Sequence, residues 1–186
     1  GYHPLASHYA LSLHPENAFR FTTSAVLEGT GLIMMNYPHN PSGQVAEEGW
    51  LRELCQYCSD RDIRLFNDAD YIILSHGPES ATLSQVAVDF PDLSWAEAFT
   101  AAKLIGNGTG WHVGAMVGSP DFIADLKEVK GKTDAGFVAP MAAGVEAAFQ
   151  NGQAGIKEYC DMSRRRLKSL IGSMTRQGMR LAIEPA

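Results

Sequence analysis

The feature that most constrains the fold is an alternation of short apolar runs with longer amphipathic stretches. Residues 47–60 carry the amphipathic pattern of a helix between the first two apolar runs. The four runs of strand length are GLIMMNY at 31–37, DIRLFND at 62–68, LSWAEAF at 93–99 and HVGAMVG at 112–118. This order is typical of a mostly parallel sheet that is covered by helices. We therefore expect a three-layer α/β domain.

The last third of the chain has a different pattern. After Pro120 the sequence becomes mainly helical, and a long helical stretch runs from about residue 153 to residue 178. The final segment RLAIEPA has the pattern of the start of another strand. We expect one domain over residues 1–165, incomplete at its N-terminal side, and a connecting helix with the start of a second, smaller domain over residues 166–186.

Composition excludes several classes of function. The 186 residues carry a net charge of −6, and the one dense basic run, residues 164–166, lies in a helical pattern where a solvated face is expected. Nucleic-acid binding is therefore not expected, and no apolar segment is long enough to cross a membrane. Three cysteines without a disulfide pattern favour a reducing compartment, which we take to be the cytoplasm. Cys55 and Cys58 form a CxxC, a spacing that one helical face also produces.

Chemically capable residues follow three of the predicted strands. The turn NYPHNPSG, residues 36–43, follows the first strand, and Asp68 and Tyr71 follow the second. Thr100 and Lys103 follow the third, ahead of a glycine-rich loop. Each segment alone could be a turn, a helix cap or a surface charge. In open α/β sheets, however, ligands collect at the carboxyl ends of the strands, so the three segments together predict a site.

Taken in order, the three segments resemble the hallmarks of the class I/II aminotransferases, which are pyridoxal 5′-phosphate (PLP) enzymes of fold type I. These hallmarks are an NPHNPTG-like turn, a DxxY strand end, and an SxxK lysine followed by a loop that ends in GxRxG. The separations also resemble the family's, with 28 residues from Asn40 to Asp68 and 35 from Asp68 to Lys103. The resemblance covers nearly the whole chain and corresponds to the large domain. It implies a homodimer whose active sites form between subunits.

The resemblance implies a role for each residue. Lys103 would hold PLP as a Schiff base and would then move a proton during transfer of an amino group between an amino acid and a 2-oxo acid. Asp68 would pair with the protonated ring nitrogen, and Asn40 and Tyr71 would donate to the phenolate oxygen of the ring.

The residues expected to contact the phosphate of the cofactor depart from the family pattern. Thr100 replaces the usual serine three residues before Lys103, which keeps a hydroxyl. His112 stands where an arginine is usual, so a titrating group replaces a permanent charge. The loop between Lys103 and His112 is also one residue longer than usual. We expect Thr100 and His112 to contact the phosphate.

Several alternatives stay open at this point. A PLP-dependent C–S lyase would use the same lysine, aspartate and tyrosine. An aminotransferase-like sensor domain of a transcription regulator and a degenerate homologue without catalysis are further possibilities. Gly106, Gly108 and Gly110 do not fit a dinucleotide loop, because a strand-like run follows them instead of a helix. The stretch KGKTDAGF, residues 130–137, is faintly similar to diaminopimelate-type aminotransferases.

Overall fold

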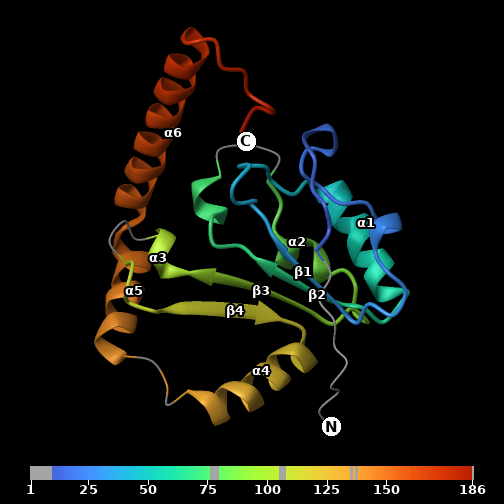
Figure 1. The fold of residues 1–186 in the computed structure, drawn as a ribbon. Coiled ribbons are helices and arrows are strands. Elements are labelled where there is room, and N and C mark those ends of the chain that lie inside the picture. Colours follow the sequence, from blue (N-terminus) through green and yellow to red (C-terminus); the bar gives the residue numbers. More distant parts are fainter. Residues whose placement is uncertain (1–9, 76–79, 105–107, 135, 137, 186) are drawn as a thin grey trace.

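The computed structural model describes residues 10–75, 80–104, 108–134, 136 and 138–185. Its centre is a four-stranded sheet in the order β1-β2-β3-β4 (Figure 1). The strands span Leu32–Asn36 (β1), Arg64–Asp68 (β2), Trp95–Thr100 (β3) and Gly114–Gly118 (β4). They coincide with the four predicted runs.

The sheet is parallel except at one edge. β1 pairs with β2 and β2 pairs with β3 in parallel, whereas β4 runs antiparallel to β3. A parallel neighbour needs a crossover long enough to bring the chain back to the starting edge. Between β3 and β4 the described helix is only four residues long, so the chain returns along the same edge and β4 reverses direction. The expected mostly parallel α/β sheet flanked by helices is confirmed.

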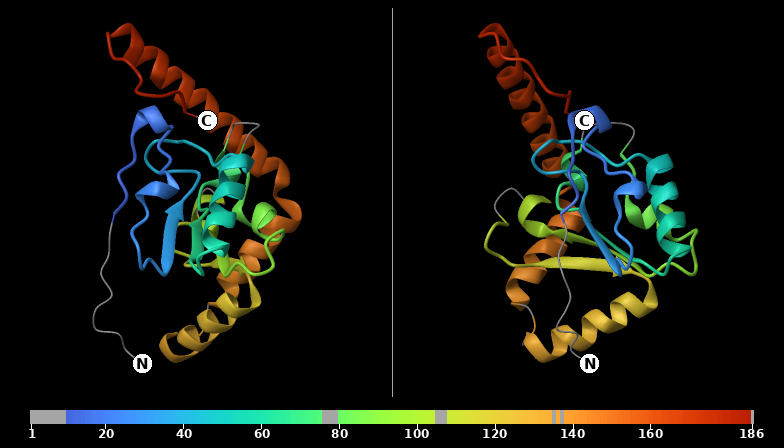
Figure 2. Two further views of the ribbon diagram at one scale, coloured as in Figure 1. Left: turned by 90° about the vertical axis from the view of Figure 1, so that its right-hand side faces the viewer. Right: turned by 45° about the vertical axis from the view of Figure 1, so that its right-hand side comes forward.

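The helices differ greatly in length, and 3-10 turns lie at Pro15–Asn17 (η1), Thr23–Ala25 (η2) and Ile72–Leu74 (η3). The helices span Glu48–Ser59 (α1), Leu83–Ala87 (α2), Ala101–Leu104 (α3), Pro120–Thr133 (α4), Ala139–Asn151 (α5) and Gln153–Arg176 (α6). In Figure 1, α1 and α2 lie together on one side of the sheet, whereas α6 extends away from it. Figure 2 shows the same extended position of α6 from two further directions. Among the described residues, no helix combines the length and the apolar character needed to cross a membrane.

The main core lies between α1, α2 and one face of the sheet. Leu51, Leu54, Cys55 and Cys58 recur at the spacing of one helical face, and all four are buried. They join side chains of the inner strand positions, such as Leu65, in one apolar cluster. Both cysteines are fully buried, and burial raises the pKa of each thiol to about 12. The CxxC spacing is therefore the packing face of α1.

On the other face of the sheet, Arg64 at the start of β2 contacts α4. Arg64 donates to the Asp125 carboxylate at 2.7 Å and to the Ser94 hydroxyl at 2.9 Å. Its guanidinium also lies 4.2 Å from the centre of the Phe122 ring, which stacks on Phe66. Charge and ring stacking together hold α4 at the amino ends of the strands, away from the edge where the predicted site lies.

The C-terminal segment differs from expectation. The run RLAIEPA was expected to begin a strand, but its described part, residues 180–185, contains none. A strand requires a neighbour with free backbone groups, and this segment pairs with no strand of the described chain. Instead the Glu184 carbonyl accepts a hydrogen bond from the Gln44 side chain at 2.7 Å. The helix α6 runs without a break across residue 165.

Candidate active site

The parallel strands bring the three predicted segments to one edge of the sheet. β1, β2 and β3 end at Asn36, Asp68 and Thr100, and the register pairs Asn36 with Asp68. The carboxyl ends of parallel strands point the same way, so the residues that follow them gather at this edge. Residues far apart in the sequence thereby become neighbours.

The turn after β1 is held by its own hydrogen bonds and by the end of β2. The side chain of Asn36 accepts from the backbone N–H of Asn40 at 2.9 Å and donates to the Asp68 carbonyl at 2.8 Å. Gly43, with φ of +71°, closes the turn by donating to the His39 carbonyl at 2.8 Å. The Asn40 amide then donates to the Tyr71 hydroxyl at 3.0 Å. The structure therefore brings together the two residues that the family resemblance assigns to one oxygen of the cofactor.

Asp68 lies beside a second carboxylate that the sequence reasoning did not single out. The Asp68 carboxylate accepts from the backbone N–H of Asp70 at 3.2 Å. Burial, the charge of Asp68 and hydrogen bonding to it raise the pKa of Asp70, while Lys103 and the Thr100 backbone act in the opposite direction. Asp70 is thus a further charged group of the site. The signal for it was present in the motif NDADY, which places two acids at one strand end.

Lys103 follows β3 in the short helix α3. The Thr100 hydroxyl accepts from the Ala102 backbone N–H at 3.3 Å and so supports the start of this helix. The Lys103 ammonium nitrogen lies 5.7 Å from the centre of the Tyr71 ring, and the side chain is half-buried. The lysine, the tyrosine and Asn40 therefore form one cluster from three different strand ends.

His112 is placed differently from the other predicted site residues. It lies two residues before β4, has a φ of +53° and is exposed. It makes no hydrogen bond to another residue of the described chain. The centre of the preceding loop, residues 105–107, which carries the expected extra residue, lies outside the described residues. The contact of His112 with the phosphate stays a prediction.

The chemistry of the clustered side chains fits PLP. A carboxylate suits a protonated ring nitrogen, an amide and a phenol can donate to a phenolate oxygen, and an amine can bond to an aldehyde. Asp68, Asn40, Tyr71 and Lys103 supply these groups at one edge, and Thr100 adds a hydroxyl three residues before the lysine. The chemistry of the residues present therefore fits the cofactor that the family uses.

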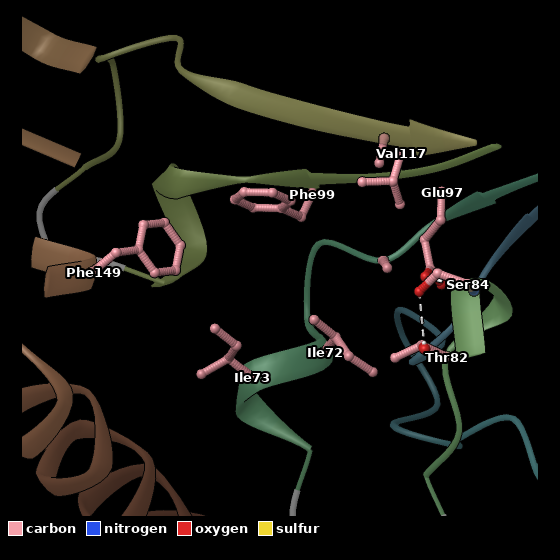
Figure 3. Close-up of a pocket in the computed structure, with 10 residues that line it drawn as sticks. Ile72, Ile73, Thr82, Ser84, Glu97, Phe99, Val117 and Phe149 are labelled. Carbon is pink, nitrogen blue, oxygen red and sulfur yellow. Dashed lines mark hydrogen bonds between the residues drawn. The ribbon is translucent and has the colours of Figure 1, made fainter. Parts of the chain in front are cut away.

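A pocket of about 220 Å³ is lined by chain neighbours of these residues, among them Ala69, next to Asp68. Its walls are mainly apolar and include Ile72, Phe99 and Phe149, with Glu97 and Thr82 at the polar end (Figure 3). None of the six residues predicted for the cofactor lines it. The pocket therefore adjoins the cluster, although the six residues themselves are not part of its walls.

Comparison with known proteins defines the class to which the chain belongs. The family model "Aminotransferase class I and II" matches residues 7–179. The chain is therefore a member of the class I and II aminotransferase family.

The similar proteins are consistent with this family. The chain is 26% identical to LL-diaminopimelate aminotransferase of Nitratidesulfovibrio vulgaris over 175 residues, which is 92% of the chain and 45% of that protein. It is 30% identical to the enzyme of the same name from Syntrophobacter fumaroxidans, over 80% of the chain and 38% of that protein. The chain spans less than half the length of these curated relatives.

Solved structures share the fold. BacF from Bacillus subtilis, in a substrate-bound structure, superposes with a TM-score of 0.79 at 20% identity, over 90% of this chain and 43% of that one. Aspartate aminotransferase from Thermus thermophilus with maleate gives a TM-score of 0.75 at 24% identity, over 90% and 44%. The arrangement of strands and helices is therefore that of aminotransferase large domains.

Proposed function

We propose that the full-length protein to which this chain belongs is a PLP-dependent aminotransferase that moves an amino group between an amino acid and a 2-oxo acid. The observation that carries the proposal is the meeting of Asn40, Tyr71 and Lys103, where the amide donates to the phenol at 3.0 Å and the amine lies 5.7 Å from the same ring. These residues come from three separate motifs of the family. A homodimer and a cytoplasmic location belong to the same proposal.

Each residue has a defined task in this proposal. When bound, PLP supplies an aldehyde that bonds to amines and a ring that withdraws electrons from the adjoining carbon. Asp68 keeps the ring nitrogen protonated by its negative charge. Asn40 and Tyr71 donate hydrogen bonds to the phenolate oxygen. Lys103 would first hold the cofactor covalently, and after its release by the substrate its free amine would move the proton between the α-carbon of the substrate and the aldehyde carbon of the cofactor.

Thr100 and His112 are proposed to contact the phosphate. The hydroxyl of Thr100 is able to donate to a phosphate oxygen, although here it accepts from the backbone of α3. His112 would have to turn its exposed ring toward the same group.

Replacing Lys103 tests the proposal. In the full-length protein, Lys103→Ala should abolish the visible absorbance band of the lysine-bound cofactor, because the covalent bond to the ε-amine cannot form. Borohydride reduction followed by peptide mapping should place the cofactor on Lys103 in the unaltered protein. The matched control is Lys127→Ala, which removes an exposed lysine of α4 and should leave the band unchanged. A reduced adduct on a different lysine would refute the assignment.

The type of reaction needs a separate measurement. The relatives named above suggest LL-diaminopimelate as the first amino donor to try, with a 2-oxo acid as acceptor. An aminotransferase forms product only when the acceptor is consumed in equal amount. Product from a cysteine-like substrate without consumption of an acceptor would indicate the lyase alternative, because breaking a C–S bond needs no amino acceptor.

A further inference from the structure

Two buried polar side chains lie behind the candidate site and have no part in holding the cofactor. Asn67 is 2% exposed and Glu97 is 7% exposed. They are directly opposite each other in the β2–β3 register, and the Asn67 amide donates to a Glu97 carboxylate oxygen at 2.9 Å. Burying polar groups of this kind is costly unless every one of them is paired, so their partners indicate what they do.

The side-chain amide of Asn67 binds both backbone groups of one residue, Tyr37. Its side-chain oxygen accepts from the Tyr37 backbone N–H at 2.9 Å, and its side-chain nitrogen donates to the Tyr37 carbonyl at 3.0 Å. Tyr37 is the first residue after β1 and begins the turn that carries Asn40. The amide of Asn67 therefore extends the pairing of β1 with β2 by one residue and sets the point from which the turn departs.

Glu97 fixes the orientation of the Asn67 amide. The Glu97 oxygen that Asn67 faces accepts hydrogen bonds, so the Asn67 atom directed at it is the nitrogen. The oxygen of the amide is then directed at the Tyr37 N–H. Glu97 itself is held by the backbone N–H groups of Leu83 and Ser84, which donate to its two oxygens at 2.9 and 3.0 Å. Figure 3 shows Glu97 reaching from β3 toward this end of α2.

We propose that Asn67 and Glu97 are positioning residues that hold the turn of residues 37–44 so that Asn40 reaches Tyr71. The inference rests on the proposed function, because Asn40 and Tyr71, whose contact the pair secures, are the proposed donors to the phenolate oxygen of the cofactor. A purely structural reading is that Glu97 only caps α2. The two readings differ in whether loss of the pair changes the turn.

Hydrogen exchange in the cofactor-free full-length protein tests the inference without relying on activity. Asn67→Leu keeps the approximate size of the side chain but removes both bonds to Tyr37, so exchange of the Tyr37 amide and of the turn around Asn40 should become about ten-fold faster or more. Glu97→Gln should cause a smaller increase, because it frees the Asn67 amide to rotate. It also keeps the experiment informative if Asn67→Leu does not fold.

The matched control is Thr82→Ala. The Thr82 hydroxyl accepts from the Gln85 N–H and caps α2, but it does not touch Asn67 or the turn. It should weaken α2 but accelerate exchange at Tyr37 less than either network variant, because Asn67 and Glu97 both remain. Equal acceleration at Tyr37 in Thr82→Ala and in the two network variants would overturn the proposal, because the effect would then be general loss of stability.

A double-mutant comparison in the PLP-loaded protein gives a second readout. Asn40→Ala should raise the pH midpoint of the visible band of the lysine-bound cofactor, since a donor to the phenolate is lost. If Asn67 acts through Asn40, Asn67→Leu should raise the midpoint too, and the double variant should shift it no further than Asn40→Ala alone. Additive shifts would overturn the inference. Absence of any visible band in the unaltered protein would instead overturn the proposed function and leave the exchange result standing.

Discussion

At the scale of single residues, the surroundings of Asp70 in the site change the pKa of its carboxyl group. Burial, the neighbouring Asp68 charge and a hydrogen bond to Asp68 raise its pKa above the ordinary value, although Lys103 acts in the opposite direction. The folded protein therefore favours the protonated form of Asp70. This group contributes stability at pH values below its unfolded pKa of about 3.9, and that contribution is lost as the pH rises through the higher folded pKa. At neutral pH the ionised Asp70 is a destabilising group.

Asp70→Asn should consequently stabilise the protein at neutral pH. The amide keeps the shape of the side chain and removes the charge that burial and Asp68 oppose. The difference in unfolding free energy between the variant and the unaltered protein should shrink as the pH falls through the raised pKa of folded Asp70, because the carboxyl group is then protonated and uncharged. Urea unfolding at a series of pH values measures this difference.

Asp161 provides a control of opposite sign. A hydrogen bond from Lys157 and its positive charge lower the pKa of this exposed acid. Asp161→Asn should therefore remove a small stabilising contribution at neutral pH. An Asp70→Asn effect that does not change with pH would show that charge is not its cause.

At the scale of elements, the close approach of β3 and β4 depends on glycine. A Cβ on Gly118 would lie 2.4 Å from the Trp95 carbonyl oxygen, and one on Gly114 would lie 2.5 Å from that of Phe99. Both obstacles are backbone atoms, which cannot move without separating the strands. Small residues at both ends of β4 thus let the antiparallel strand pack on β3, whose end carries Thr100.

Gly118→Ala should therefore destabilise the protein by about 1–3 kcal/mol, as expected when atoms are forced into a packed region. Gly155→Ala is the matched control, because it lies in α6 with no atom within 4 Å of the added Cβ. Alanine is favoured over glycine inside a helix by about 1 kcal/mol, so the control should be neutral or stabilising. Thermal and urea unfolding of both variants compare the two sites. Equal stability of the two variants would contradict the close packing of β3 and β4.

At the scale of the whole molecule, the core between α1 and the sheet protects two thiols. Cys55 and Cys58 are fully buried, whereas Cys160 on α6 is partly exposed. Burial raises the pKa of both core thiols to about 12, so at neutral pH they are in the unreactive protonated form. Exposure of these two groups requires the core itself to open.

Reaction of Cys55 and Cys58 with a thiol reagent should therefore report global unfolding. In a Cys160→Ala variant of the full-length protein, labelling of this pair at about pH 8 should be slow without denaturant and should accelerate in step with the urea unfolding transition. Mass spectrometry of labelled peptides identifies the residues. Rapid labelling of the folded protein would show that the CxxC is accessible, which would revive a redox or metal-binding role.

Much of this protein could be predicted from the sequence because the patterns that define it are local. Alternation of apolar runs located the four strands and α1, since side-chain periodicity is set by the geometry of each element. Spacing along the chain also placed Asp68, Tyr71 and Lys103 at or just after strand ends, and so at one edge of a parallel sheet. The family followed from the same three segments and the family model that matches residues 7–179.

Tertiary structure alone decided how these residues meet. Asn40 and Tyr71 are 31 positions apart, and their hydrogen bond depends on the register of β1 with β2 and on the path of the turn. The antiparallel direction of β4 and the bond between Asn67 and Glu97 likewise depend on which strands become neighbours. Such contacts join residues with no local relation in the sequence. Local pattern therefore determined the elements and their chemistry, while long-range packing determined which side chains act together.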